Sequence, residues 1–398
     1  MSTTHYSCWR TASTYRSYCT HTLRSAPCHN STILEQYDTA IRDTLQSVLN
    51  VRMTESVWNQ AVLPVSRGGL GIRAATHVAL PAFLSSVTSA ESLTVQLLPP
   101  RLHPTAGISD PLFEQAVIEW QLRSNAALPN LPQRAIQKAW DSPLLDVVSA
   151  RVLSAAQTQA GFARLTAAAA PFAGAFLEAI PCSAVGTRMD NSSFRIAAAL
   201  RLGAEICSPH NCICGAPVDS SGVHGLSCRK SSGRQIRHSA VNGIIKRALA
   251  SAEVPARLEP SSLSRDDGKR PDGMSLMPWK EGRCLIWDFT CADTLAQSHL
   301  DRAVLRAATV ADDAEQRKRQ KYVSLSATYY FVPICIETLG PMGEEAAAFF
   351  ADVGQRIATA TGEPRSKSFL MQRLSIAVQQ GNAACVLGTV PMSTDLYI

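Results

Sequence analysis

An aspartate inside a short apolar segment places the strongest constraint on how this chain can fold. Residues 284–290 read Cys-Leu-Ile-Trp-Asp-Phe-Thr, and Asp288 is the charged residue among them. Apolar and aromatic runs of this length are typical of a buried strand. Because an unpaired aspartate is costly to bury, Asp288 is expected to have a partner inside the fold.

A second acid, Asp272, follows Pro271 and lies sixteen residues before Asp288. If the two acids stand at the ends of neighbouring strands, joined by a turn around residues 278–282, their carboxylates meet. Mg²⁺ prefers oxygen ligands and keeps several waters, so two carboxylates and a substrate phosphate suffice for a site. Such a cation generates hydroxide and neutralises charge on a transferring phosphate. A solvated turn acid and a strand acid paired with arginines would share this spacing.

Two lysines on a predicted helix over residues 300–321 are candidates to assist these acids. Lys318 and Lys321 are three residues apart and therefore share a helix face. A lysine beside a metal site can orient the attacking water or stabilise the developing charge.

Length and composition indicate a folded chain of two or three domains. The chain has 398 residues, of which 46% are hydrophobic and 18% are charged. Its net charge of +6 permits a polyanionic partner without requiring one. No apolar run reaches the roughly 18 residues that span a bilayer, so no membrane partner is expected. The first 34 residues contain no acid, as in a transit peptide, but an unstructured start is the alternative.

Hydrophobic periodicity predicts a multidomain protein with an α-helical N-terminal half and a C-terminal α/β domain. The first half has expected helices over residues 31–50, 74–89 and 111–180, with a Pro-rich linker over 97–104. The second half has the expected order helix, three strands, helix, strand, helix, which describes a mixed sheet. These elements are expected over residues 235–251, 256–259, 271–276, 283–290, 300–321, 328–337 and 343–361, and a last helix over 368–380 is expected on the edge of the domain.

Four residues between these halves have the spacing of a small zinc site. Cys212, Cys214, His224 and Cys228 lie within 17 residues, and structural zinc takes four tetrahedral N/S ligands. Cys207 is an alternative ligand and His210 a weaker one, and loop cysteines with a surface histidine would give the same pattern. Basic side chains that could contact a phosphate backbone follow at once, namely Arg229, Lys230, Arg234 and Arg237.

Four segments, taken in order, resemble the restriction-like endonuclease of site-specific non-LTR retrotransposons, a PD-(D/E)xK fold. They are Arg237-His238, Lys-Arg-Pro-Asp at 269–272, Trp-Asp-Phe-Thr at 287–290 and Lys-Arg-Gln-Lys-Tyr at 318–322. Retrotransposons of this class also carry a Cys-Cys-His-Cys knuckle, which holds structural Zn²⁺, just before the nuclease. The cluster of this chain occupies the same position.

The resemblance implies roles for individual residues. Asp272 and Asp288 would bind Mg²⁺ or Mn²⁺, Lys318 or Lys321 would be the catalytic lysine, and His238 would lie near the site or the DNA. Thr290 stands where other members of the fold carry that lysine. The acid sometimes found on the first helix of this fold is not obvious here, and Asn242 lies one helical turn after His238. Lys269 and Arg270 would join the nucleic-acid contacts.

Residues 37–86, which include the turn Gly68-Gly69-Leu70-Gly71, resemble the thumb and connection of these reverse transcriptases. The resemblance implies the C-terminal part of a longer nuclear protein, without a polymerase palm, that nicks DNA for target-primed reverse transcription. DNA and element RNA would be its partners. An inactive nucleic-acid-binding fragment of a decayed or host-retained element is the alternative. The expected organisation is an unassigned start (1–30), a thumb-like region (31–95), a helical linker (96–190), a knuckle (195–232) and a nuclease (233–398).

Overall fold

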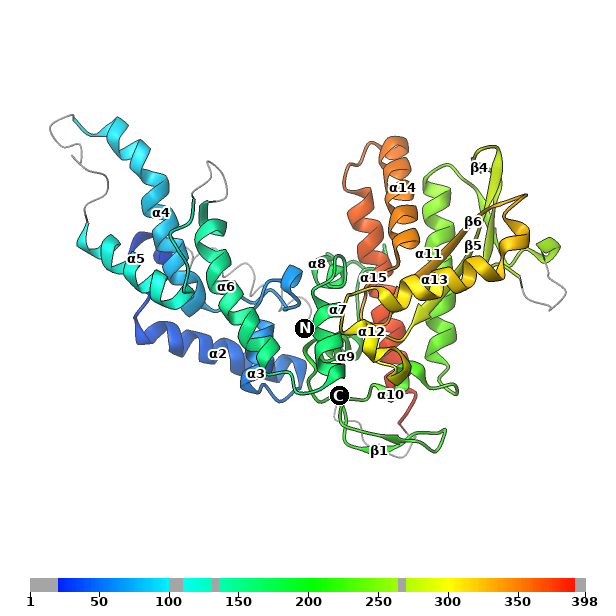
Figure 1. The fold of residues 1–398 in the computed structure, drawn as a ribbon, viewed down its shortest axis with the longest axis horizontal. Coiled ribbons are helices and arrows are strands. Elements are labelled where there is room, and N and C mark those ends of the chain that lie inside the picture. The colour runs from blue at the N-terminus through cyan, green and yellow to red at the C-terminus, as the bar shows by residue number, and fades with distance from the viewer. Residues whose placement is uncertain (1–20, 100–109, 131–135, 264–269, 391–398) are drawn as a thin grey trace. The chain divides into compact units, whose positions relative to one another are not determined.

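A computed structural model describes residues 21–99, 110–130, 136–263 and 270–390 (Figure 1). The chain divides into two compact units. The helical region expected over 96–190 is split between them, because the division falls after Ala155. Unit 1 consists of Met1–Val48, Met53–Pro64 and Leu70–Ala155, and unit 2 consists of Leu49–Arg52, Val65–Gly69 and Ala156–Ile398.

Unit 1 is helical, as its periodicity predicts. The helix expected over 31–50 is α2, and the one expected over 74–89 continues further, to Leu97. Trp120 and Trp140 meet edge-on in its core, with ring centroids 5.0 Å apart. The indole N–H of Trp120 donates to the carbonyl of Trp140 at 2.7 Å, so this large side chain is buried with its polar atom satisfied. Its helices are α2 (Thr32–Leu49), α3 (Glu55–Ala61), α4 (Ala75–Leu97), α5 (Pro111–Ser124) and α6 (Ile136–Ser154).

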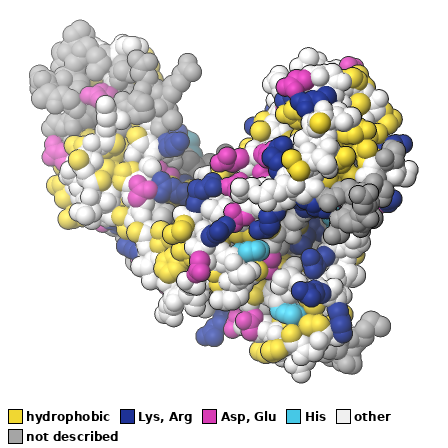
Figure 2. Space-filling view, turned by 45° about the vertical axis from the view of Figure 1, so that its right-hand side comes forward, with side chains coloured by type: hydrophobic (Ala, Val, Ile, Leu, Met, Phe, Trp, Pro, Cys, Tyr) yellow, Lys and Arg dark blue, Asp and Glu magenta, His cyan; other side chains and the backbone are white. Residues whose placement is uncertain are grey.

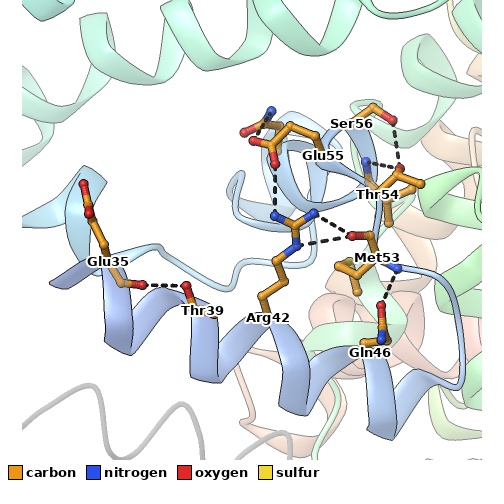
Figure 3. Close-up of polar contacts among 10 residues, drawn as sticks. Glu35, Thr39, Arg42, Gln46, Met53, Thr54, Glu55 and Ser56 are labelled. Atoms are coloured by element: carbon orange, nitrogen blue, oxygen red, sulfur yellow. Dashed lines mark hydrogen bonds and ion pairs between the residues drawn. The ribbon is translucent and has the colours of Figure 1, made fainter. Parts of the chain in front are cut away.

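Polar contacts fasten α2 to the start of α3 (Figure 3). Arg42 donates from Nε and Nη2 to the carbonyl of Met53, at 3.2 and 2.7 Å, and from Nη1 to Glu55 at 3.0 Å. The N–H of Met53 donates to Gln46 at 2.9 Å. Thr54 caps α3, because its hydroxyl accepts from the N–H of Val57.

Unit 2 contains the Cys/His cluster and the α/β domain. The expected order of helix, three strands, helix, strand and helix is present from α11 to α14. The helix expected over 300–321 is two helices instead, because Ala308 adopts a left-handed φ of 69° between them. The elements are α7 (Gln159–Ala168), α8 (Ala175–Glu178), α9 (Asn191–Leu202), β1 (His210–Asn211), β2 (Pro217–Val218), α10 (His224–Ser227), α11 (Gly233–Ser251), β3 (Ala256–Leu258), β4 (Gly273–Lys280), β5 (Arg283–Ala292), α12 (Leu300–Ala303), α13 (Thr309–Lys321), β6 (Tyr330–Glu337), α14 (Glu344–Thr361) and α15 (Ser366–Leu387).

The predicted mixed sheet is confirmed. Its strand order is β3-β4-β5-β6, antiparallel as far as β5 and parallel between β5 and β6. Two local expectations are wrong. Pro278 lies within β4, beside a shift in register, and the turn is confined to Glu281 and Gly282, whose φ angles of 53° and 72° suit a tight hairpin. Asp288 lies in the middle of β5 rather than at its end.

Side chains of β5 alternate between two helical layers, because successive strand residues face opposite ways. Leu285, Trp287 and Phe289 pack with residues of α11, α14 and α15. Ile286 packs on the other face with Tyr322, just after α13. Helix α15 is not an edge helix as expected, since it contacts α8, α9, α11 and α14 and is buried on several sides.

Two buried glutamates hold helix starts in this domain. Glu315 of α13 accepts from the N–H groups of Glu345 and Ala346, at 2.9 and 3.0 Å, in the first turn of α14. Glu337 of β6 accepts from the N–H of Ala311, at 3.2 Å, in the first turn of α13. Burial raises the pKa of both carboxyls to about 7, although these backbone hydrogen bonds oppose the shift.

Candidate functional site

Asp288 faces α13 because it alternates with Trp287 and Phe289 along β5. It is 4% exposed, and the Nζ of Lys318 on α13 forms an ion pair with its Oδ2. The buried acid therefore has the partner that its apolar context requires. Burial raises the pKa of Asp288, while the charge of Lys318 opposes this shift.

Tyr322 links the lysine-bearing helix to Asp288 and to the backbone shortly before Asp272. Its hydroxyl lies 3.4 Å from Oδ1 of Asp288 and 3.1 Å from the carbonyl of Arg270, two residues before Asp272. Lys321 donates to the same hydroxyl at 2.9 Å and lies over the tyrosine ring. The contacts of the two candidate lysines therefore differ. Lys318 contacts the carboxylate of Asp288 directly, whereas Lys321 contacts Tyr322, whose hydroxyl contacts that carboxylate.

Asp272 lies immediately before β4, beside Asp288. Its backbone N–H donates to the carbonyl of Trp287 at 2.9 Å, and its Oδ2 accepts from the N–H of Phe289 at 2.6 Å. Nε2 of His238 on α11 lies 3.1 Å from the same oxygen. Burial alone would raise the pKa of Asp272, but the contacts with His238 and Phe289 lower it overall. The hydrogen bond to Asp272 raises the pKa of His238.

Asn242, one helical turn after His238 on α11, contacts several residues of this site, and a hydrogen bond from its side chain contributes to lowering the pKa of Asp272. Its Oδ1 accepts from Nε1 of Trp287 at 2.9 Å, and its Nδ2 lies 3.4 Å from Nδ1 of His238. Gly273 leaves room for the same indole, since a Cβ at that position would lie 2.0 Å from Trp287. The sequence offers no direct signal for this packing.

Asp272 and Asp288 lie near each other, because Oδ2 of Asp272 accepts from the N–H of Phe289, the residue after Asp288. Carboxylate oxygens are the kind of ligand that a hard divalent cation takes. Lys318 and His238 each hold one carboxylate oxygen in this arrangement. The acids and lysine predicted from separate segments of sequence therefore converge at one place.

A cavity of about 460 Å³ opens beside these residues. We call the site around Asp272 and Asp288 the acidic site. Four of the residues that line the cavity belong to this site or adjoin it: His238, Phe289, Thr290 and Lys318. Thr290 and Lys318 thus face one space, although they belong to a strand and a helix. The remaining lining residues come from the segment that joins the Cys/His cluster to α11 and from β5: Arg229, Ser231, Arg234, Gln235, Arg237 and Cys291.

The basic residues expected to contact nucleic acid are placed differently from one another. Arg229 and Arg234 are exposed and line the cavity. Lys230 is exposed and lies 3.4 Å from the carbonyl of Ile213. Arg237 is only 2% exposed and donates to Asn382 of α15, although it belongs to the lining of the cavity.

The other two expected contacts lie on the approach to β4. Arg270 forms an exposed ion pair with Glu259, and Lys269 lies outside the described residues. Figure 2 shows lysine and arginine side chains in several groups on one face, with acidic side chains among them.

The Cys/His cluster forms around the β1–β2 hairpin and α10. Ligand atoms of Cys212, Cys214, His224 and Cys228 all lie within 4.8 Å of one another, so this group could bind zinc. A hydrogen bond from the backbone of Ala216 contributes most to lowering the pKa of Cys214 to about 6. Burial shifts the neighbouring Cys212 the other way and raises the pKa of its thiol to about 11. The thiolate is the form that binds a metal, so the low pKa of Cys214 suits that role.

The two alternative ligands are outside this group. Sγ of Cys207 lies 3.5 Å from the carbonyl of Asp219. His210 spans between the carbonyl of Ser208, at 2.9 Å from Nδ1, and the hydroxyl of Thr389, at 3.0 Å from Nε2. It therefore ties the hairpin to the end of α15.

Comparison of the chain with models of protein families and with curated proteins finds no match to either. Within the described ranges, no helix combines the length and apolar character needed to cross a membrane.

Proposed function

We propose that unit 2 is a metal-dependent DNA endonuclease derived from a non-LTR retrotransposon. The observation that carries this proposal is the convergence of Asp272, Asp288 and Lys318, which come from the residue before β4, from β5 and from α13. Two carboxylates with a lysine can support metal-dependent hydrolysis of a phosphodiester.

Each residue has a role in this proposal. Asp272 and Asp288 would hold one Mg²⁺ or Mn²⁺, which supplies activation of water and neutralisation of phosphate charge. Lys318, once released from Asp288, can donate to a phosphate oxygen or to the attacking water. His238 fixes the orientation of Asp272 through their 3.1 Å contact. Tyr322 holds Asp288 and the backbone before Asp272 in register.

The proposed biological step is nicking of target DNA, which leaves a 3′-hydroxyl for target-primed reverse transcription. A nuclear location and contacts with DNA and element RNA belong to the same proposal. The Cys/His cluster, holding structural Zn²⁺, would lie next to the arginines that line the cavity. Its resemblance to a retroelement knuckle supports a role in nucleic-acid binding.

Binding of nucleic acid without cleavage is a second candidate, and one observation favours it. Thr290 occupies the strand position where a lysine would be expected, and the oxygen of Asn242 on α11 is taken by Trp287. The site then has fewer groups available to bind a cation and assist the reaction than a nuclease that has both the strand lysine and the first-helix acid.

Nicking of supercoiled plasmid distinguishes the two candidates. The zinc-loaded protein is expected to convert plasmid to the open circle with Mg²⁺ or Mn²⁺, and Asp288→Ala is expected to abolish this conversion while DNA binding persists. Equal activity of the two proteins, or none in either, contradicts the endonuclease and leaves the binding protein.

A further inference from the structure

A line of hydrogen bonds runs from the core of the sheet to the carboxylate of Asp272. It begins at Trp287, which is completely buried and whose indole N–H donates to Oδ1 of Asn242 at 2.9 Å. Nδ2 of Asn242 lies 3.4 Å from Nδ1 of His238, and Nε2 of His238 lies 3.1 Å from Oδ2 of Asp272. The side chains come from β5, from α11 and from the residue before β4.

The indole fixes the direction of the amide. An indole N–H can only donate a hydrogen bond, so Asn242 turns its oxygen toward Trp287 and its NH2 group toward His238. Exchange of the two ends of the amide would leave a buried N–H unpaired, because Trp287 is completely buried and Asn242 is 4% exposed. The indole itself packs against Gly273, where a Cβ would lie 2.0 Å from the ring. The core of the sheet therefore sets the direction of the amide.

The direction of the amide in turn sets the tautomer of His238. An NH2 group can only donate, so the Nδ1 atom that it faces accepts, and the proton of the neutral ring is on Nε2. That proton faces Oδ2 of Asp272. The imidazole also packs against Phe289, with ring centroids 5.7 Å apart, and this contact helps to keep the ring in the same orientation.

Oδ2 of Asp272 is held from two sides. His238 donates to it from α11, and the N–H of Phe289 donates to it from β5 at 2.6 Å. Oδ1 is therefore the oxygen that these two donors leave for a cation. Hydrogen bonds that orient a metal ligand from outside typically change metal affinity by about 10- to 100-fold when they are lost.

We propose that Trp287 and Asn242 are positioning residues, which fix His238 as the Nε2–H tautomer and thereby present Oδ1 of Asp272 to the metal. The role of Asp272 as a metal ligand rests on the proposed function, whereas the tautomer follows from the hydrogen bonds alone. Burial raises the pKa of Asp272, whereas hydrogen bonds from His238, Phe289 and, to a smaller extent, Asn242 lower it. A smaller part of the effect of Asn242 therefore reaches the carboxylate without His238.

Imidazole ¹⁵N NMR of the zinc-loaded chain tests the tautomer without a catalytic metal or cleavage. Spectra are recorded at alkaline pH, where the ring is neutral, and the signals of His238 are those lost in His238→Gln. Wild-type protein is expected to show a proton on Nε2 and none on Nδ1. Asn242→Asp keeps an acceptor for Trp287 but replaces the NH2 group by a second acceptor, so it is expected to place a proton on Nδ1. A proton on Nδ1 in wild-type protein, or the same pattern in both proteins, overturns the proposal.

Titration of the same protein with Mn²⁺, followed by EPR, tests the effect on the metal site, which is identified as the binding lost in Asp288→Ala. Asn242→Ala is expected to weaken this binding roughly tenfold in wild-type protein and by no more than about threefold in His238→Ala, because the amide acts mainly through the ring. Ser239→Ala is the matched control, since Ser239 is exposed on the same helix, and is expected to leave the affinity unchanged. Equal losses in the two backgrounds, or wild-type affinity in Asn242→Ala, overturn the positioning role.

The two measurements separate this proposal from the proposed function. Wild-type protein that shows the expected tautomer but binds no Mn²⁺ through Asp288 supports the line of hydrogen bonds and contradicts the metal centre alone. Mn²⁺ binding that is lost in Asp288→Ala, together with a proton on Nδ1 in wild-type protein, supports the metal centre and overturns the positioning role. Asn242→Asp decides the question if Asn242→Ala does not fold, because it leaves Trp287 its acceptor.

Discussion

Asp288 shows how much a single residue can predict. A charged side chain within an apolar strand needs a partner, and the structure supplies Lys318. The identity of that lysine could not be predicted, because Lys318 and Lys321 share a helix face. Their different contacts depend on Tyr322, which is completely buried between the helix and the strands and fixes how α13 sits on β5.

The two lysines give a prediction at this scale. Lys318→Met is expected to reduce the single-turnover nicking rate by about a hundredfold or more, the scale for loss of one charge-stabilising group. Lys321→Met is its matched control and is expected to cost less than tenfold, because Lys321 contacts Tyr322 rather than a carboxylate. A larger loss in Lys321→Met than in Lys318→Met would reverse the assignment.

Elements were easier to predict than contacts between them. The alternation of β6 and the apolar β5 run indicated two strands, which pair in parallel as the connecting helices allow. The break between α12 and α13 was missed, because Ala308 carries no glycine or proline signal for its left-handed φ. The packing of α15 was also missed, since its burial on several sides comes from tertiary neighbours rather than from its own periodicity.

The Cys/His cluster gives the first prediction at the scale of elements. Zinc content of freshly purified protein is expected near one ion per chain, and Cys228→Ser is expected to lose the ion and destabilise the β1–β2 hairpin. Cys207→Ser is the control and is expected to retain zinc, because Cys207 lies outside the ligand group. Atomic absorption measures both, and retention of zinc in Cys228→Ser would contradict the assigned ligands.

The capping glutamates give a pH prediction. Their folded pKa of about 7 exceeds the ordinary value of 4.5, so the folded state keeps protons that the unfolded state releases. These groups therefore make stability fall as pH rises from 4.5 to 7. Glu315→Gln is expected to make that fall shallower, by at most about 1.4 kcal/mol per pH unit for one proton.

Urea unfolding at several pH values between 4.5 and 7.5 measures this effect. Glu205→Gln is the control, because Glu205 is exposed. An unchanged pH dependence in Glu315→Gln, with the fold intact, would show that Glu315 is not protonated at neutral pH.

At the scale of the whole molecule, the division into units does not follow a single cut in the chain. Unit 2 includes Val65–Gly69, which the sequence indicated only as a Gly-rich turn. Arg201 of α9 is buried and donates to the carbonyls of Val65 and Gly69, at 2.7 and 3.0 Å. Contacts across 136 and 132 residues cannot be predicted from local patterns, so the domain boundary was not visible in the sequence.

This interleaving gives a prediction for a truncated protein. A fragment of residues 156–398 is expected to unfold at a lower temperature than unit 2 in the full chain, because Arg201 loses two backbone acceptors. A buried charged group that loses its hydrogen bonds costs several kcal/mol. Calorimetry of both proteins measures the difference, and equal unfolding temperatures would show that Val65–Gly69 contributes nothing to unit 2.

The most direct test of the central claim is single-turnover nicking of supercoiled plasmid by zinc-loaded protein with Mg²⁺. The control variant is Asp352→Asn, because Asp352 pairs with Lys280 and Arg356 outside the acidic site. Wild-type protein and this variant are expected to nick at the same rate. Asp272→Asn and Asp288→Asn are expected to fall to the rate without protein while still binding the plasmid. Nicking by either of these two variants at the wild-type rate, or no nicking by wild-type protein, would contradict the account.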